Sequence, residues 1–136
     1  MPISKRRGGR ELAFQLLFQT DVGDIPLDEV IRVHKMSSEA QSHVWGFAEE
    51  LANGAWNYRE DSDAIISRYS QGWSVGRMPN ADRNILRIAL YEIFHVEDIP
   101  VNVSVNEAVE LAKEYSTVDS ARFINGVLGN VVRNEL

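Results

Sequence analysis

Apolar residues recur with the period of an α-helix along almost the whole chain, and this pattern constrains the fold more than any other feature. Between residues 10 and 22, Leu12, Ala13, Leu16 and Leu17 share one helical face. Comparable stripes run through residues 27–31, 44–51, 65–69, 80–95, 105–115 and 123–132. Only residues 101–103 alternate as a strand would, and that segment is too short to pair convincingly. The pattern predicts an all-α fold, a compact bundle of about six or seven helices.

Prolines and a few polar residues divide the pattern into helices. Pro79 precedes the most apolar segment, residues 80–95, whose apolar positions cover more than one face, so we expect this helix at the centre of the core. Pro100 breaks the chain again. Ser104 and Glu107 then have the spacing of a capping box, which predicts a helix beginning at Ser104. The last helix is expected to start at Asp119 or Ser120.

The size and composition of the chain indicate one globular domain spanning residues 1–136. Of its 136 residues, 44% are hydrophobic and 25% are charged, which is typical of a soluble protein. No apolar run reaches the ~18 residues of a membrane span, and no signal peptide follows the basic start. We therefore expect a cytoplasmic protein with no membrane association. The absence of cysteine excludes disulfide scaffolds, thiol nucleophiles and cysteine-based metal sites.

The charge is unevenly distributed. The chain has a net charge of −6, yet its first ten residues hold Lys5, Arg6, Arg7 and Arg10 and no acidic residue. Such a basic arm, residues 1–10, can contact phosphates while the acidic body repels nonspecific polyanions. A solvated, frayed terminus would give the same pattern, and the arm alone does not separate the two interpretations.

Catalytic patterns are present but lack their required context. Residues 72–76 match G-x-S-x-G, which in hydrolases follows a strand and precedes a helix. Here both flanks are helical, so we interpret the segment as a connector between helices. The three histidines lack metal-ligand spacing, and Glu107, Glu110 and Glu114 are interpreted as a solvated helix face. The sequence thus predicts no enzyme, no cofactor and no metal.

Aromatic and amide side chains near the basic arm suggest a different chemistry. Phe14 and Phe18 are one helical turn apart, away from the face that carries Leu12 and Leu16, and Gln15 lies beside them. Rings, amides and a nearby Arg10 are the groups that bind single-stranded RNA. Packing of both rings on a neighbouring helix is the other interpretation, and spacing alone favours it. Arg122 and Phe123 have the same ambiguity.

Three blocks of the sequence resemble the NusB family of bacterial transcription antitermination factors. The blocks are RRGGRELAFQLLF at residues 6–18, ADRNILRIALYEI at 81–93, and VSVNEAVELAKEY at 103–115 continuing into DSARFINGVL at 119–128. They keep the family's order and span essentially the whole chain. The resemblance is weakest between residues 23 and 76, where mainly the helical pattern agrees.

The resemblance implies a helical fold of two subbundles and a role in ribosomal RNA transcription. The expected partners are single-stranded boxA RNA, the basic ribosomal protein NusE and the RNA polymerase antitermination complex. By position, the RNA-binding residues implied are Lys5, Arg6, Arg7, Arg10, Gln15, Phe18, Arg122, Phe123 and Asn125. Asp82 is implied to face the basic partner protein, which suits the acidic body.

Gly8 and Gly9 depart from the family pattern, since better helix-forming residues are expected at these positions. Each glycine costs about 1 kcal/mol relative to alanine within a helix. We therefore expect the first helix to begin at Arg10 and the arm to be mobile until RNA binds. The modest basicity of the arm predicts weak RNA binding by this protein alone and a gain of affinity with NusE. A homodimer that covers the arm is also compatible with the resemblance.

Three other functions remain as alternatives. The chain could be a helical protein-binding adaptor without specific RNA recognition. It could be an RNA-binding module of the kind fused to ribosomal RNA methyltransferases, although no catalytic domain follows residue 136. A hydrolase that uses Ser74 is the least favoured of the three.

Overall fold

The computed structural model describes residues 3–37 and 42–136, and it describes side chains for residues 6–37 and 44–136. In these residues the backbone forms seven helices and no strand: α1 (Ile3–Gly23), α2 (Leu27–Ser37), α3 (Ser42–Asn57), α4 (Arg59–Tyr69), α5 (Asn80–His95), α6 (Val101–Tyr115) and α7 (Val118–Glu135). The prediction of an all-α fold with six or seven helices is confirmed. No helix in the described ranges is long and apolar enough to cross a membrane.

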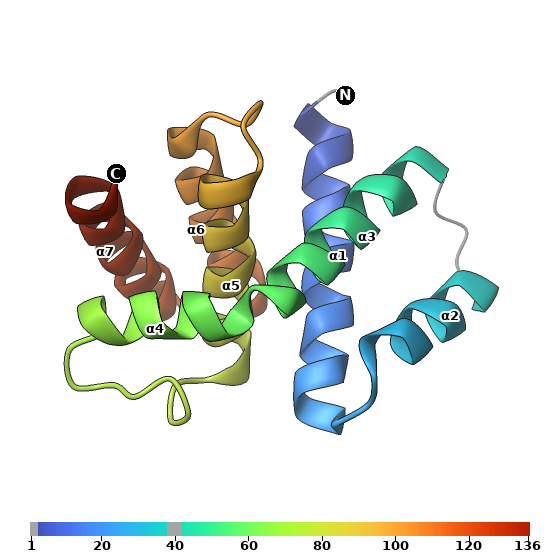
Figure 1. Ribbon diagram of the computed structural model, residues 1–136, viewed down its shortest axis with the longest axis horizontal. Helices are drawn as coiled ribbons and strands as arrows, with labels where there is room; N and C mark the ends of the chain where they lie inside the picture. The colour runs from blue at the N-terminus through green and yellow to red at the C-terminus, as the bar shows by residue number, and fades with distance from the viewer. Residues whose placement is uncertain (1–2, 38–41) are drawn as a thin grey trace.

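The helices form two groups that meet at α5. Helices α1, α2 and α3 make up one group, and α4, α6 and α7 lie on the other side of α5 (Figure 1). Helix α5 contacts α1 and α3 in the first group and α4, α6 and α7 in the second. The predicted pair of subbundles is therefore present, and the most apolar segment of the sequence joins them.

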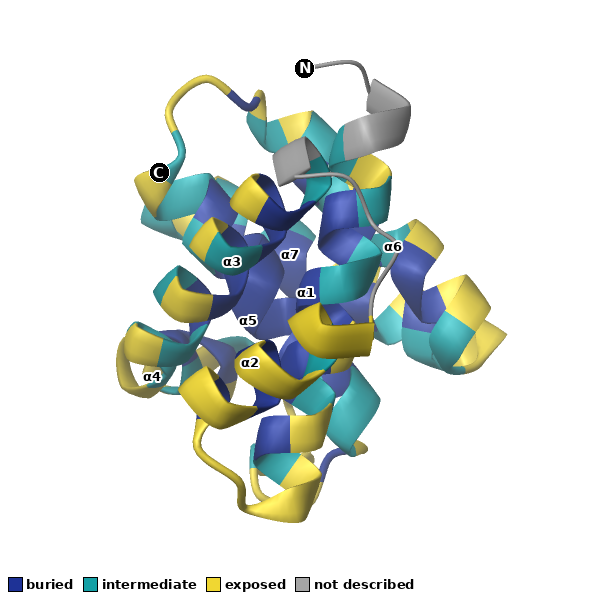
Figure 2. Cartoon of the chain, turned by 90° about the vertical axis from the view of Figure 1, so that its right-hand side faces the viewer, coloured by how far each residue is buried: buried dark blue, intermediate teal, exposed yellow. Residues whose placement is uncertain are grey.

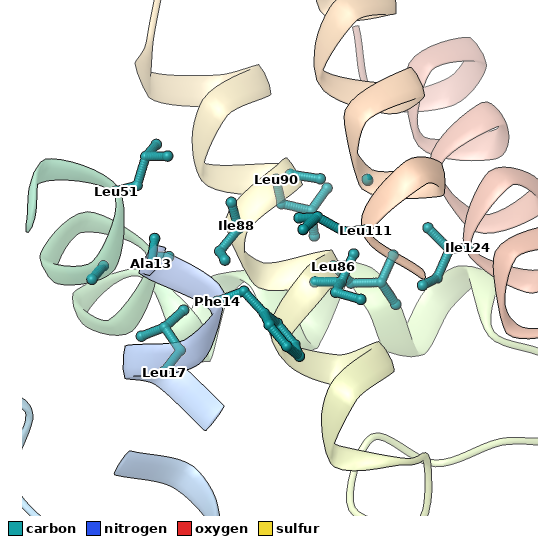
Figure 3. Close-up of a cluster of buried hydrophobic side chains, with 14 of the residues drawn as sticks. Ala13, Phe14, Leu17, Leu51, Leu86, Ile88, Leu90, Leu111 and Ile124 are labelled. Atoms are coloured by element: carbon teal, nitrogen blue, oxygen red, sulfur yellow. The ribbon is translucent and has the colours of Figure 1, made fainter. Parts of the chain in front are cut away.

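The core follows from this central position of α5. Buried side chains concentrate along α1 and α5, whereas α2 exposes most of its surface (Figure 2). From α5, Leu86, Ile88 and Leu90 meet Ala13, Leu17 and Leu51 on one side and Leu111 and Ile124 on the other (Figure 3). All eight are at most 5% exposed. The two subbundles consequently share one hydrophobic core.

Two helices begin directly after a proline, and the predicted start of the helix after Pro100 is wrong. Pro79 and Pro100 are the residues that precede α5 and α6, because their fixed φ suits the entry to a helix. Helix α6 thus begins at Val101, three residues before the predicted capping box, and the strand-like segment 101–103 forms its first turn. Ser104 lies inside the helix, where its hydroxyl donates to Glu92 Oε1 at 3.0 Å instead of capping.

The expectation that the first helix begins at Arg10 is also wrong, because α1 already begins at Ile3. Gly9 is buried against α3, and a Cβ atom at this position would lie 2.6 Å from Cδ2 of Phe47. Glycine is needed there to let the two helices approach, and the packing of α1 offsets its low helix propensity. Gly8, in contrast, faces open space.

The G-x-S-x-G segment lies in the connection between α4 and α5, as predicted. Gly72 has φ of +80°, in the left-handed region that favours glycine, so the first glycine of the motif is explained by a turn.

Candidate nucleic-acid interface

Arg10 lies in a buried network of ion pairs between α1, α5 and α6. Its Nε and Nη2 atoms each donate to a carboxylate oxygen of Glu92 at 2.8 Å, and its Nη1 atom donates to Glu107 at 3.4 Å. The side chains of Arg10 and Glu92 are 2% and 1% exposed. Ser104 donates to the same Glu92 carboxylate. The guanidinium group is therefore fully engaged inside the protein, and it fixes α1 against α5 and α6.

Arg7 extends this network to the surface. Its Nε and Nη2 atoms donate to the two oxygens of Glu107, at 3.1 and 2.7 Å, and its side chain is 53% exposed. Glu107 is buried and holds both arginines, so its interpretation as part of a solvated face is wrong. We call Arg7, Arg10, Glu92, Ser104 and Glu107 the arginine–carboxylate network.

Arg6, near the N-terminal end of α1, also pairs with a carboxylate. Its Nη2 atom donates to Asp98 Oδ2 at 2.7 Å, and this hydrogen bond lowers the pKa of the Asp98 carboxyl. Asp98 itself is well exposed, so solvent and salt weaken the pair. The side chain of Lys5 lies outside the described residues. Of the three arginines of the arm, Arg7 is thus half-exposed at the surface, Arg6 is 24% exposed and Arg10 is buried.

The structure brings Arg7 together with two predicted residues of α7. A groove of about 580 Å³ between α6 and α7, the α6–α7 groove, is lined by Arg7, Lys113, Arg122 and Asn125 among others. The Arg122 side chain is 79% exposed, and its nearest carboxylate oxygen, from Asp119, is 3.8 Å away. Three cationic groups that are far apart in the sequence therefore border one surface channel, together with the carboxylates of Glu107 and Glu110, which pair with Arg7 and Lys113.

Gln15 and Phe18 border a second, smaller groove, which lies between α1 and the end of α6 and shares no lining residue with the first. This aromatic groove is lined by Phe14, Gln15, Phe18, Gln19 and Tyr115. The Phe14 ring is 4% exposed and belongs to the core, whereas Phe18 is half-buried and Gln15 is exposed. Of the two open interpretations, packing holds for Phe14, and Phe18 keeps an accessible edge.

Tyr115 is the residue in this region that the sequence pattern placed differently. Its position in the apolar stripe of α6 predicts a buried core residue, and the ring does pack against the core, but it is only partly buried and one side borders the groove. The ring centroid lies 4.9 Å from that of Phe14. The hydroxyl donates to Glu11 at 3.3 Å and accepts from Gln15 Nε2 at 3.4 Å. Burial and the nearby Glu11 raise the pKa of Tyr115.

Phe123 and Asp82 belong to a third groove, of about 600 Å³, where the chain between α4 and α5 meets the start of α7. This acidic groove is lined by Trp73, Asp82, Ser116, Asp119 and Phe123, together with Pro79, Thr117 and Ser120. Asp82 is 3% exposed, and its Oδ1 atom accepts from the Ser116 hydroxyl at 2.9 Å. Asp119, in contrast, is almost fully exposed. The Trp73 and Phe123 rings lie 6.2 Å apart and form the apolar part of the groove.

Comparison with known proteins identifies the family. The NusB family model matches residues 7–133. The transcription antitermination protein NusB of Symbiobacterium thermophilum is 47% identical over 138 residues, which cover 94% of this chain and 89% of that protein. NusB of T. maritima has a TM-score of 0.85 at 33% identity and covers 98% of this chain and 92% of its own.

A chain from the crystal structure of the antitermination factors NusB and NusE in complex with double-stranded RNA has the same fold. It superposes with a TM-score of 0.86 at 24% identity, over 97% of this chain and 98% of its own. The resemblance predicted from the three sequence blocks is confirmed by the family match and the similarity to the S. thermophilum protein. Both extend over nearly the whole length of the sequence, and they show that the chain belongs to the NusB family of transcription antitermination proteins.

Proposed function

We propose that this protein binds single-stranded boxA RNA of ribosomal RNA leader transcripts together with NusE, and so helps RNA polymerase to read through terminators. The observation that carries the proposal is the α6–α7 groove, where Arg7, Lys113 and Arg122 gather, together with the aromatic groove between α1 and the end of α6. Cations beside accessible rings and amides are what a single strand requires, because its phosphates and its bases are both exposed. Residues 1–136 then act as one RNA-binding domain in the cytoplasm.

The side chains divide into phosphate and base contacts. Arg6, Arg7 and Arg122, with Lys5 beyond them, are assigned to phosphates, whereas Gln15, Phe18 and Asn125 are assigned to bases. Arg10 receives a different role from the one that the family resemblance implies. Because its donors are engaged with Glu92 and Glu107, Arg10 positions α1 and Glu107, and through Glu107 it orients Arg7.

The acidic groove is the proposed contact for NusE. Asp119 supplies exposed negative charge, which complements a basic partner, and Asp82 supplies a further carboxylate that is 3% exposed in the groove lining. The Trp73 and Phe123 rings supply apolar area, so Phe123 receives a different role from the RNA contact that the family resemblance implies. Phe123 and Arg122 are adjacent on α7: Arg122 borders the α6–α7 groove, Phe123 borders the acidic groove, and both line a further groove between α4 and α7. The RNA and the partner protein would consequently meet along the start of α7, and this contiguity supports a higher RNA affinity in the presence of NusE. A homodimer that covered Arg7 would compete with RNA.

Fluorescence anisotropy with labelled RNA tests the proposal. We expect a boxA RNA to bind more tightly than a scrambled RNA, and NusE to increase the difference. A plot of log affinity against log salt concentration should have a slope near −0.7 for each phosphate contact. The Arg122→Ala variant should bind boxA RNA more weakly, whereas Arg32→Ala, which removes an equally exposed arginine on α2, should not.

The adaptor alternative makes the opposite prediction. A protein-binding adaptor would bind both RNAs equally weakly, and NusE would leave that binding unchanged. In that case the affinity for NusE, measured with Asp119→Asn, would still report on the acidic groove. Equal affinities for boxA and scrambled RNA across the salt series would exclude the RNA-binding proposal.

A further inference from the structure

The aromatic groove between α1 and the end of α6 has the composition of a nucleobase site. Its five lining residues are three aromatic side chains and two amides, and none of them is charged. Phe14 forms the buried floor, with its ring centroid 5.9 Å from Phe18 and 4.9 Å from Tyr115. The rings of Phe18 and Tyr115 are therefore contributed by different helices and are joined through a ring that is fixed in the core.

The size of the groove restricts its occupant. Its volume is about 250 Å³, below the ~300–1,000 Å³ of pockets that hold drug-sized ligands. One planar ring system fits such a volume, whereas a run of several nucleotides does not. Gln15 and Gln19 are both exposed at the rim and lie one helical turn apart. Their amides can donate to and accept from the edge of a base.

The charged residues near the aromatic groove determine which part of an RNA strand can approach it. Glu11 accepts from the Tyr115 hydroxyl, and Glu11 and Glu114 both line the adjoining groove between α1 and α6. These carboxylates repel a phosphate group. Of the nearby cations, Arg7 and Lys113 border both this adjoining groove and the α6–α7 groove, whereas Arg122 borders the α6–α7 groove. A strand whose phosphates follow those cations would have to turn a base, not its backbone, towards Phe18 and Tyr115.

We propose that one unstacked nucleobase of the bound RNA inserts between the Phe18 and Tyr115 rings, over Phe14, with Gln15 and Gln19 at its edge. This deepens the proposed function and rests on it. Tyr115 contributes its ring to stacking, and its hydroxyl, held between Glu11 and Gln15, orients the Gln15 amide. The inference adds Tyr115 and Gln19 to the RNA-binding surface.

The test uses boxA RNAs in which the fluorescent base 2-aminopurine replaces one nucleotide at a time, mixed with the full-length protein and NusE. Stacking on an aromatic ring quenches this fluorophore, so a single position should lose most of its fluorescence on binding. Phe18→Ala and Tyr115→Ala should each abolish that quenching and weaken binding roughly 5- to 150-fold, the range expected for base–aromatic stacking. Tyr115→Phe keeps the ring and should keep the quenching.

Tyr58→Ala provides the control. Tyr58 is also half-buried, and its ring also packs on another ring, that of His95, with centroids 4.3 Å apart, but it lies between α3 and α4 and borders none of the grooves described above. Its removal should leave RNA affinity and quenching unchanged. Circular dichroism of each variant checks folding, and the quenching pattern of the unmodified protein is informative even if Tyr115→Ala does not fold.

Failures of the two proposals are distinguishable. If the unmodified protein does not prefer boxA RNA, the proposed function fails. If it binds boxA RNA but quenches no position, or all positions equally, the nucleobase site is overturned and the function stands. The same holds if Tyr115→Ala weakens the binding of NusE instead of RNA, because the groove would then be a protein contact.

Discussion

Arg7 and Arg10 of α1 and Arg122 of α7 all contribute to the proposed RNA surface, directly or by positioning, yet the protein holds them in opposite ways. Arg7 forms an ion pair with Glu107, and Arg10 forms one with Glu92. Arg122, in contrast, has its nearest carboxylate oxygen at 3.8 Å and a side chain that is 79% exposed. Arg10 has exchanged water for fixed partners inside the fold, and Arg7, whose side chain is 53% exposed, has done so in part. Arg122 still has its hydration shell and its rotamer freedom, so it can follow an incoming phosphate. A basic residue in a basic segment can therefore have a structural role, and the partners of its side chain decide which role it has.

The largest effect that separates the two groups should be on stability. Arg10→Ala leaves Glu92 buried without its cation, which we expect to lower the free energy of unfolding by about 3–5 kcal/mol. Arg122→Ala removes an exposed side chain and should leave the free energy of unfolding unchanged. Urea denaturation followed by circular dichroism measures both. Equal stability of Arg10→Ala and the unmodified protein would mean that the network does not hold α1 in place.

A smaller effect should separate the two glycines that lie between Arg7 and Arg10. Gly9→Ala brings a Cβ atom within 2.6 Å of the buried Phe47 ring, and overpacking of this kind costs about 1–3 kcal/mol. Gly8→Ala enters open space and should stabilise the helix by roughly 0.5–1 kcal/mol. Thermal unfolding of the two variants gives opposite shifts in Tm. Shifts of the same sign would contradict the close contact between α1 and α3.

The smallest effect should appear in the salt dependence of RNA binding. Arg122→Ala and Arg7→Ala each remove one proposed phosphate contact, so each should reduce the magnitude of the log–log slope by about 0.7. The loss of affinity should be smaller for Arg7→Ala, because in the unmodified protein Arg7 must give up part of its bond with Glu107 to reach a phosphate. Anisotropy titrations over a salt series measure slope and affinity together. An unchanged slope for either variant would remove that arginine from the RNA surface.

The sequence predicted the helices well because their signals are local. Apolar periodicity and the prolines at 79 and 100 locate α5 as the central helix, and the structure confirms this. The wrong predictions of the starts of α6 and α1 also rested on local signals, but other interactions outweigh those signals in the fold. Ser104 and Glu107 form a capping box by spacing, yet both side chains have partners on other helices, and Pro100 already starts α6. Gly8 and Gly9 disfavour a helix by propensity, but packing against Phe47 extends α1 through them.

The candidate site was harder to predict because its defining contacts are long-range. Arg10 and Glu92 are 82 positions apart, and Gln15 and Tyr115 are 100 apart. Helical phase shows that Arg10 and Tyr115 lie on particular faces, but it does not show which side chain faces them. The sequence therefore identified residue types suited to RNA, and only the fold separates the buried Arg10 from the exposed Arg122, or the core ring of Phe14 from the accessible ring of Tyr115.

The arginine–carboxylate network also sets an order in time. Its cations are in the first helix, and its carboxylates are in the fifth and sixth, so a ribosome that synthesises this protein releases the cations long before their partners exist. During that interval the α1 guanidinium groups are unpaired on the nascent chain. They become a defined surface when α6 emerges, because Glu107 of α6 then binds Arg7 and Arg10. These contacts join residues that are 100 and 97 positions apart in the sequence. The proposed RNA surface is thus assembled last, and a chain released before α6 would carry free arginines without the scaffold that orients them.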